Sequence, residues 1–416
     1  MIPLNNLLHL TMPEAAIPLI SLNSTVSLYP LSKQLENGVV IFGRGDQYLE
    51  LPAEGLEFLS WLDQGLSLAQ ARERFEAAYN PFPDDQVFEL INTFVECDFV
   101  AAIDGQPVAP RRTPLKSNAD WIPQSWARLL FSKPVLITWM AIVTPAAILW
   151  ILTPQLWPRR SDYFWADYYS VIILVAMLLW LLGMLLHETS HWLACRAKGI
   201  EATITWTQRL GFFPMSQTIM HNIWAVPRAA RLLPLAAGMV WDVLSLSVAL
   251  YLLYFAGVGL LSLSLGATKL LKFYVLLITM ALTSQFWFFS KMDGYFLVSA
   301  LLGQRNLQTD TYHWLKSKVV RSSPFDPPSS GMKFIYIYAL ITIFWGGLFM
   351  GQFLLVSLPI KIQLIWDSFI RILNHGDISR LEFYDALGVF ASQVIYYGLL
   401  IYVYLRDISP RLPKQR

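Results

Sequence analysis

Charged residues are scarce in this chain of 416 residues: together they make up 14% of it, whereas about 25% is usual in soluble domains. Cysteine is nearly absent, since only Cys97 and Cys195 occur, which excludes a disulfide-stabilised secreted scaffold. The net charge of +2 is too small to indicate nucleic acid as a partner. Because 55% of the residues are hydrophobic and the mean hydropathy is +0.45, we expect a membrane protein with several spanning segments.

The acidic residues are concentrated in the N-terminal part of the chain. Nine of the twelve Glu lie before residue 115, which predicts a soluble domain there. The first residues lack a basic region and contain several prolines, so they make a poor signal peptide and the domain is expected in the cytoplasm. The segment 40–51 predicts a hairpin, and three short amphipathic helices are expected after it, the last one capped by Asp84 and Asp85. This order of elements is typical of a small α+β winged-helix domain.

One part of this domain resembles a known family. Residues 48–65, with the sequence YLELPAEGLEFLSWLDQG, the helices after them and an apolar strand at 99–103 are similar to the PqqD-like fold. The resemblance implies a leader-peptide recognition element, which binds the peptide as an added strand on the hairpin edge. A winged helix that only docks on the membrane part is the alternative. The predicted boundaries are an N-terminal segment (1–34), the recognition domain (35–106), a linker (107–127) and a membrane domain (128–416).

Six apolar stretches are long enough to cross about 30 Å of hydrocarbon. They lie at 134–155, 166–192, 230–260, 268–290, 333–357 and 386–405. Lys and Arg number 20 in the segments expected inside and seven in those expected outside. This asymmetry predicts a multi-pass protein of the cell membrane with both termini in the cytoplasm. The segment 360–385, between the last two spans, has helical periodicity and predicts an interfacial helix.

The second predicted span contains the complete pattern HExxH, formed by His187, Glu188 and His191. Residues i and i+4 share a face of a helix, so both imidazoles can bind one Zn²⁺ while Glu188 acts as the general base. A histidine pair without metal is the alternative, but it leaves ionisable groups in hydrocarbon without a compensating cation. A third ligand is needed, and Asp293 is the best candidate because it lies at the same end of its span. Its alternative role is a helix cap before Gly294.

Three further residues are weaker candidates for this site. His221 and Cys195 are candidate ligands, although a surface histidine and a small packing residue are the commoner roles of such residues. Asp242 is an acid within the third span, and we expect it to hydrogen-bond a ligating histidine or to lie near the scissile bond.

Three motifs in order resemble the site-2 protease family of intramembrane zinc metallopeptidases. They are HETSHWLACRAKG at 187–199, AGMVWD at 237–242 and MDGY at 292–295. The resemblance implies that His187, His191 and Asp293 bind zinc, that Glu188 activates water, and that a peptide bond is cut within or near the membrane.

The chain departs from the family pattern in the group that would stabilise an oxyanion. Met239 and Asp242 stand where the family has Pro and Asn, and an ionised Asp cannot donate a hydrogen bond. The family's Asn and Pro shortly before the Asp-Gly pair are also missing. Gln285 is the nearest amide to that pair and is the candidate substitute.

The residues after the HExxH helix alternate between Thr and apolar side chains over 201–217. They predict a hairpin, with Gly211 and Pro214 near its turn, whose edge could hold an extended substrate. A membrane-surface loop is the alternative.

The predicted function is that of an intramembrane zinc metalloendopeptidase, which cleaves a peptide or membrane-associated substrate near the cytoplasmic face. We expect this enzyme to act in the maturation or export of a leader-containing peptide, with an exporter or a maturation complex as its partner. Two alternatives remain open: cleavage of a membrane-anchored regulator, and a non-catalytic zinc-containing partner in peptide binding or export.

Overall fold

The computed structural model describes residues 20–36, 38–111, 117–209, 213–319, 331–374 and 380–408. Most of the predicted N-terminal segment, Gly211 of the predicted hairpin turn and the basic C-terminal tail lie outside these ranges. The chain divides into two compact units. The N-terminal unit contains Met1–Ser117, Ile200–Thr203 and Ile219–Pro227, and the membrane unit contains Asn118–Gly199, Ile204–Thr218 and Arg228–Arg416.

The N-terminal unit combines two three-stranded sheets with three helices. The strand orders are β1-β5-β6 and β2-β3-β4. The strands are β1 (Val26–Leu28), β2 (Ser32–Glu36), β3 (Val39–Arg44), β4 (Gln47–Pro52), β5 (Val100–Ile103) and β6 (Gln106–Pro107). The helices are α1 (Gly55–Asp63), α2 (Leu68–Ala78) and α3 (Asp84–Glu96).

Local sequence signals account for most of these elements. The predicted hairpin is confirmed: β3 pairs antiparallel with β4, and Arg44 lies opposite Gln47. Helix α2 begins with a capping box, in which the Ser67 hydroxyl accepts from the Gln70 N–H and the Gln70 side chain accepts from the Ser67 N–H. The predicted cap of α3 is wrong, because Pro83 is the N-cap residue and the two Asp after it lie inside the first turn. There the positive end of the helix dipole favours their charge.

One hydrophobic core joins the strands and helices of the N-terminal unit. Burial of apolar side chains removes them from water and is the main favourable contribution to folding. The fully or almost fully buried members are Val26, Val40, Phe42, Phe58, Leu59, Leu62, Leu68, Ala71, Val87, Ile91, Phe94, Val95, Phe99, Val100 and Ile103.

The segment Ile219–Pro227 comes from the middle of the chain and packs on β2 and β3 of the N-terminal unit. Its short helix η3 spans Ile223–Ala225. The Asn222 N–H donates to the Gly45 carbonyl at 2.7 Å. A Cβ on Gly43 would lie 3.0 Å from Asn222 Oδ1, so the close approach favours glycine at that position. The sequence gives no periodic signal for this contact.

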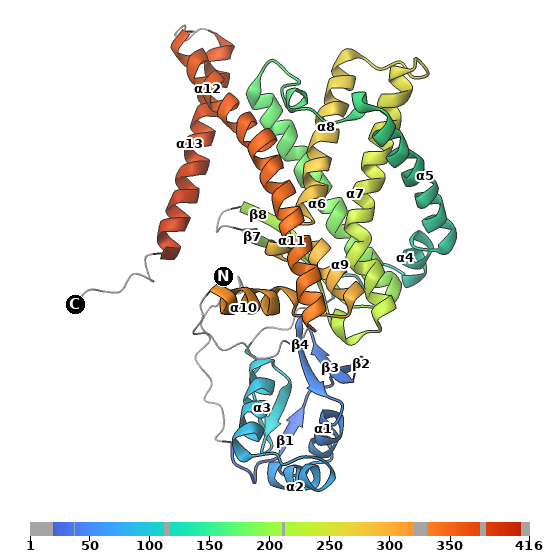
Figure 1. Cartoon of the computed structure of the whole chain (residues 1–416), viewed down its shortest axis with the longest axis vertical. Coiled ribbons are helices and arrows are strands. Elements are labelled where there is room, and N and C mark those ends of the chain that lie inside the picture. The colour runs from blue at the N-terminus through green and yellow to red at the C-terminus, as the bar shows by residue number, and fades with distance from the viewer. Residues whose placement is uncertain are drawn as a thin grey trace, which may run out of the picture. The chain divides into compact units, whose positions relative to one another are not determined.

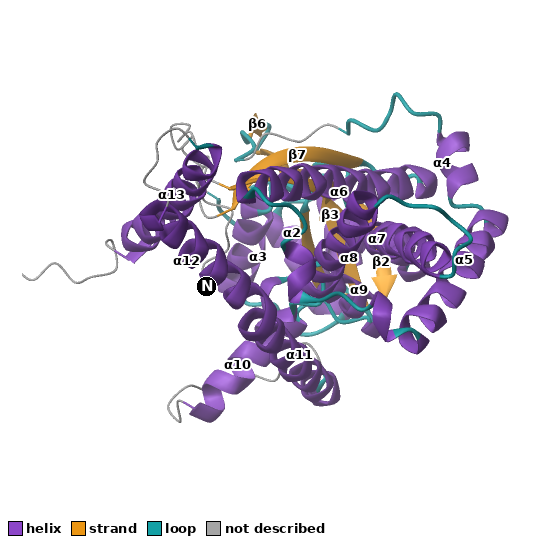
Figure 2. Ribbon diagram, turned by 90° about the horizontal axis from the view of Figure 1, so that it is seen from above, coloured by secondary structure: helices purple, strands orange, loops and turns teal. Residues whose placement is uncertain are grey.

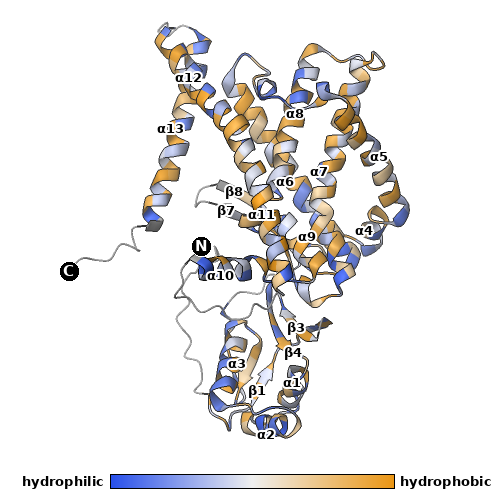
Figure 3. Cartoon of the chain, in the orientation of Figure 1, coloured by the Kyte–Doolittle hydropathy of each residue, from blue (hydrophilic) through white to orange (hydrophobic). Residues whose placement is uncertain are grey.

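The membrane unit contains, in its described part, six helices long and apolar enough to cross a membrane, which confirms the expectation of a multi-pass helical protein. Most of their residues are hydrophobic, as the colouring by hydropathy shows (Figure 3). The candidate spans are Gln124–Leu152, Tyr169–Lys198, Arg228–Gly257, Leu265–Ser284, Met332–Asn374 and Leu381–Arg406.

These spans are built from α4 (Gln124–Leu130), α5 (Lys133–Leu152), α6 (Tyr169–Lys198), α7 (Arg228–Gly257), α8 (Leu265–Ser284), α11 (Met332–Gln352), α12 (Leu358–Asn374) and α13 (Leu381–Ile408). The shorter elements are η1 (Pro154–Leu156), η2 (Arg160–Tyr163), β7 (Ala202–Arg209), β8 (Phe213–Met220), η4 (Phe288–Ser290), α9 (Asp293–Leu302) and α10 (Leu307–Val319). Helices α6, α7 and α8 lie side by side (Figures 1 and 2), and α7 also contacts α5 and α9.

The region between the last two predicted spans differs from the expectation. It does contain the expected helix, at Leu358–Asn374, but this helix continues the fifth span, since helix runs without a break from Met332 to Asn374. A π-helical turn at Phe353–Ser357 joins α11 to α12. Pro359 lacks an N–H and so cannot complete a regular helical hydrogen bond, and the π turn, which ends two residues before it, accommodates that gap.

Candidate metal centre

Helix α6 places the two histidines of HExxH on one buried face. His187 is 6% exposed and His191 is 2% exposed. Their ring centroids lie 4.8 Å apart, as expected for residues one turn apart on the same face. The helix continues past them to Gly199, whose positive φ of 71° forms a left-handed C-cap. Both imidazoles are therefore fixed well inside a long helix rather than at a fraying end.

Helix α7 holds the Nδ1 atoms of both histidines. His187 Nδ1 lies 2.7 Å from Asp242 Oδ2, and His191 Nδ1 lies 2.6 Å from the Pro234 carbonyl oxygen. A carbonyl oxygen and an ionised carboxylate only accept hydrogen bonds, so both Nδ1 atoms carry the hydrogen and donate it. Each neutral imidazole then has a lone pair on Nε2. This arrangement of outer partners fixes the tautomer, as around metal-binding histidines.

Asp293 comes from the first residue of α9, which follows a tight connection from α8. The Gly294 N–H donates to the Gln285 carbonyl at 3.0 Å, and a Cβ on Gly294 would lie 2.6 Å from that oxygen. The glycine of the Asp-Gly pair is therefore required by close backbone packing. Met292, not Asp293, is the N-cap residue of α9, and the Asp293 carboxylate is turned to the histidines.

Three atoms converge at one point: Nε2 of His187, Nε2 of His191 and Oδ2 of Asp293. The two nitrogens lie 3.1 Å apart, and the carboxylate oxygen lies 2.8 and 3.2 Å from them. In a tetrahedral zinc site with bonds of about 2.0–2.1 Å, ligand atoms lie about 3.3 Å apart. The spacing fits one small cation, and a cation would relieve the repulsion between three converging lone pairs. His187, His191 and Asp293 thus form a group that could hold a metal ion.

Glu188 lies between the two histidines in sequence, but its carboxylate is held by a different element. The Thr218 N–H of β8 donates to Glu188 Oε2 at 2.7 Å. The Thr218 hydroxyl donates to the Glu188 carbonyl oxygen at 2.9 Å. The candidate base and the candidate ligands therefore have separate supports.

Of the weaker candidates, Asp242 contacts this group through His187 Nδ1, as expected, and the others do not join it. Cys195 is fully buried in α6, and His221 belongs to the N-terminal unit, where its Nε2 lies 2.9 Å from Thr203 Oγ1. Gln285 supports the site through its main-chain carbonyl. Its side-chain Oε1 is buried and has no hydrogen-bond partner among the residues that the structure describes.

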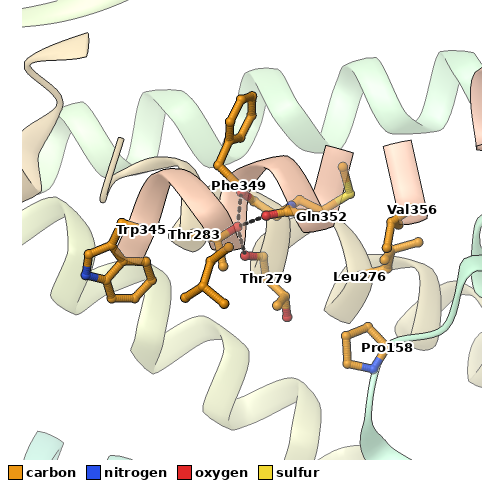
Figure 4. Close-up of a pocket in the computed structure, with 10 residues that line it drawn as sticks. Pro158, Leu276, Thr279, Thr283, Trp345, Phe349, Gln352 and Val356 are labelled. Atoms are coloured by element: carbon orange, nitrogen blue, oxygen red, sulfur yellow. Dashed lines mark hydrogen bonds between the residues drawn. The ribbon is translucent and has the colours of Figure 1, made fainter. Parts of the chain in front are cut away.

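A pocket of about 260 Å³ lies elsewhere in the membrane unit, between α8 and α11 (Figure 4). Its walls are mostly apolar, and the Thr283 hydroxyl donates to Gln352 Oε1 at 2.6 Å across it. None of the residues of the metal group lines this pocket. It is a mostly apolar gap between two spans and is not part of the candidate metal centre.

Two residues of the site have no motif signal in the sequence that would have identified them. Pro234 acts through a main-chain oxygen, which any residue carries, and Thr218 is 30 residues from its partner. The AGMVWD segment did indicate the region of Gly238 and Asp242. Comparisons with family models, with curated proteins and with solved structures gave no match.

Proposed function

We propose that this chain is a zinc metalloendopeptidase that cleaves peptide bonds at the membrane, with the mechanism of the site-2 protease family that its motifs resemble. The observation that carries the proposal is the convergence of two imidazole nitrogens and one carboxylate oxygen within 3.2 Å, beside a carboxylate that is held separately. A structural metal site would not need that adjacent Glu. An enzyme that activates water needs a base beside the cation.

The chemistry follows from the roles of the residues. Zinc bound by His187, His191 and Asp293 would polarise the scissile carbonyl and lower the pKa of an attacking water. Glu188 accepts a proton from that water as its oxygen bonds to the carbonyl carbon. The carbon–nitrogen bond then breaks, and Glu188 gives the proton to the leaving amine. Asp242 keeps its hydrogen bond to His187 throughout and so maintains the tautomer that leaves Nε2 free to bind the metal.

The N-terminal unit is proposed to be the PqqD-like, winged-helix recognition domain for a leader peptide. Strand β2 is an outer strand of the order β2-β3-β4, which is the position to which an extended peptide can add. Leu35 on this strand is 57% exposed and offers an apolar contact to such a peptide. The substrate class would then be a precursor peptide in maturation or export. Deletion of residues 1–115 should abolish its binding, and unchanged binding and cleavage would remove this role.

The proposed location is the cell membrane, with both termini in the cytoplasm. The excess of Lys and Arg on one side of the six spans supports this orientation. The metal group then lies toward the cytoplasmic side, where water has access.

The test combines metal analysis with a cleavage assay. Purified wild-type protein in detergent should contain about one zinc per chain, and it should cut a pool of synthetic 20–30-residue peptides with an apolar half. Glu188→Gln should keep the zinc but lower cleavage by at least about 100-fold. Asp293→Ala should lose zinc, whereas Ser190→Ala in the same pattern should behave as wild type.

Each outcome of this test favours one of the possible functions or changes one residue assignment. Zinc without cleavage in the wild type would overturn the peptidase proposal and favour a non-catalytic partner in peptide binding or export. Full metal occupancy in Asp293→Ala would remove Asp293 from the ligands. A short precursor gene beside an exporter gene would favour peptide maturation, and an adjacent anti-sigma factor gene would favour cleavage of a regulator.

A further inference from the structure

Strand β8 lies along the face of α6 that carries Glu188. The Ser216 N–H donates to Met184 Sδ at 3.2 Å, and the Thr218 N–H donates to Glu188 Oε2 at 2.7 Å. Met184 and Glu188 are four residues apart and so share one face of the helix. The side chains of Ser216 and Thr218 are buried, whereas Gln217 between them is exposed. Strand β8 therefore contacts α6 at two successive positions of one helix face, and the Thr218–Glu188 hydrogen bond is one part of this contact.

The donors involved belong to the outer edge of the β7–β8 hairpin. In an antiparallel pair, the N–H groups of alternate residues point to the partner strand and those between them point away. Because the N–H groups of Ser216 and Thr218 point to α6, they are not part of the ladder with β7. The helix, and not a third strand, occupies this edge of β8.

Thr218 makes two hydrogen bonds to the same residue. Its N–H holds one carboxylate oxygen of Glu188, and its hydroxyl holds the Glu188 main-chain carbonyl at 2.9 Å. Among the residues that the structure describes, no other hydrogen bond to this carboxylate is found. A Glu side chain with several rotatable bonds gains its orientation only from such contacts, and misplacement of a catalytic group by about 1 Å can cost on the order of 100-fold in rate.

We propose that Thr218 is the positioning residue of Glu188: its N–H fixes Oε2, so that Oε1 is left to take the proton of the attacking water. The inference rests on the proposed function for the base role of Glu188. It adds that one main-chain N–H of β8, that of Thr218, orients the base. It also explains why a residue far from the motif makes two bonds to the one motif residue that binds no metal.

The kinetic test removes the N–H without touching the ligands. Thr218→Pro deletes the donor, and proline is tolerated on a strand edge where its missing N–H faces away from the ladder. Ser216→Pro is the matched control, because it deletes the neighbouring edge N–H, which is bonded to Met184 instead. We expect Thr218→Pro to lower kcat on the peptide pool at least about tenfold with KM within about twofold, and Ser216→Pro to change kcat less than about threefold.

Two further variants keep the strand intact. Thr218→Val keeps the β-branched shape but removes the hydroxyl, and it should lower kcat by about three- to tenfold. Thr218→Ser restores the hydroxyl and should return kcat to within about twofold of wild type. All four variants should retain the zinc content of the wild type, since the three ligand residues are unchanged.

A measurement that needs no catalysis accompanies the kinetics. Glu188→Ala should raise amide hydrogen exchange at Thr218 at least about tenfold, while exchange at Ser216 stays within about twofold. An active wild type with equal kcat in Thr218→Pro and Ser216→Pro, or an unchanged Thr218 amide in Glu188→Ala, would overturn the inference and leave the peptidase proposal standing. A wild type that cuts no peptide would overturn both.

Discussion

Gly238 has no side chain, and this absence determines whether the ligand atoms of the site can converge. It lies on α7 between the two groups that hold the histidine Nδ1 atoms. An ideal Cβ at this position would lie 2.4 Å from the Nε2 atoms of both His187 and His191. Real Cβ atoms do not approach nitrogen so closely, and the histidines are themselves held by α7. The absence of a side chain keeps open the space in which the three ligand atoms converge.

We predict that Gly238→Ala lowers metal affinity by at least about tenfold, because the methyl group displaces both Nε2 atoms. Gly183→Ala is the matched control, since that helical glycine lies one turn before His187 and has no atom within 4 Å of its ideal Cβ. Competition with a chromophoric zinc chelator measures both affinities. Equal affinities for the two variants would contradict this account of Gly238.

At the scale of elements, α6 is fastened by a residue distant in sequence. Asp385 of α13 accepts hydrogen bonds from the Tyr169 N–H at 3.0 Å and from the Ser170 N–H at 2.8 Å. These are orphan donors of the first turn of α6, so a side chain of another helix acts as their cap. Asp385 is only 6% exposed, and Arg371 lies 3.8 Å from it. The helix that carries HExxH is thus fixed at its start by α13.

Removal of this cap should loosen the start of α6. We predict that Asp385→Ala lowers the free energy of unfolding by about 1–3 kcal/mol, because a buried and a part-buried N–H group lose their acceptor and Arg371 loses its partner. Glu382→Ala, at an exposed position one turn earlier, should change it by less than about 0.5 kcal/mol. Chemical unfolding in detergent gives both values, and faster amide exchange at Tyr169 and Ser170 should appear in the first variant alone.

The sequence allowed the prediction of those elements whose cause is local. Six spans follow from apolar length, the β3–β4 hairpin from its turn, and the pairing of His187 with His191 from helical spacing. The continuous helix from α11 to α12 was not predicted, because a π turn that accommodates Pro359 gives no periodic signal. Thr218 and Asp385 were not predicted either, because their partners are 30 and more than 200 residues away and no spacing rule connects them.

At the scale of the whole molecule, neither compact unit is one continuous stretch of the sequence. The segment Ile219–Pro227 follows a strand beside α6, yet it belongs to the N-terminal unit. His221 is one of its anchors: its N–H donates to the Glu201 carbonyl at 2.8 Å, and its ring contacts the Thr203 hydroxyl. Burial lowers the pKa of His221 below its ordinary value of 6.5, while the negative charges of Glu201 and Asp46 raise it to a smaller extent.

The sign of the pH effect follows from this shift. In the unfolded segment His221 binds its proton at a higher pH than in the folded segment. Neutral His221 therefore contributes its full stabilisation of the folded segment above pH 6.5, and this contribution is lost as the pH falls through the folded pKa. We predict faster amide exchange over 219–227 at about pH 5.5 than at about pH 7.5, after correction for intrinsic rates. His221→Gln should abolish the difference. A pH dependence that persisted in this variant would assign it to another group.

The boundary between the two units falls inside β8, between Thr218 and Ile219. The residue that holds the Glu188 carboxylate and the first residue of the N-terminal unit's inserted segment are therefore joined by one peptide bond. A displacement of the main chain at Ile219 therefore reaches the Glu188 carboxylate through one peptide bond and one hydrogen bond.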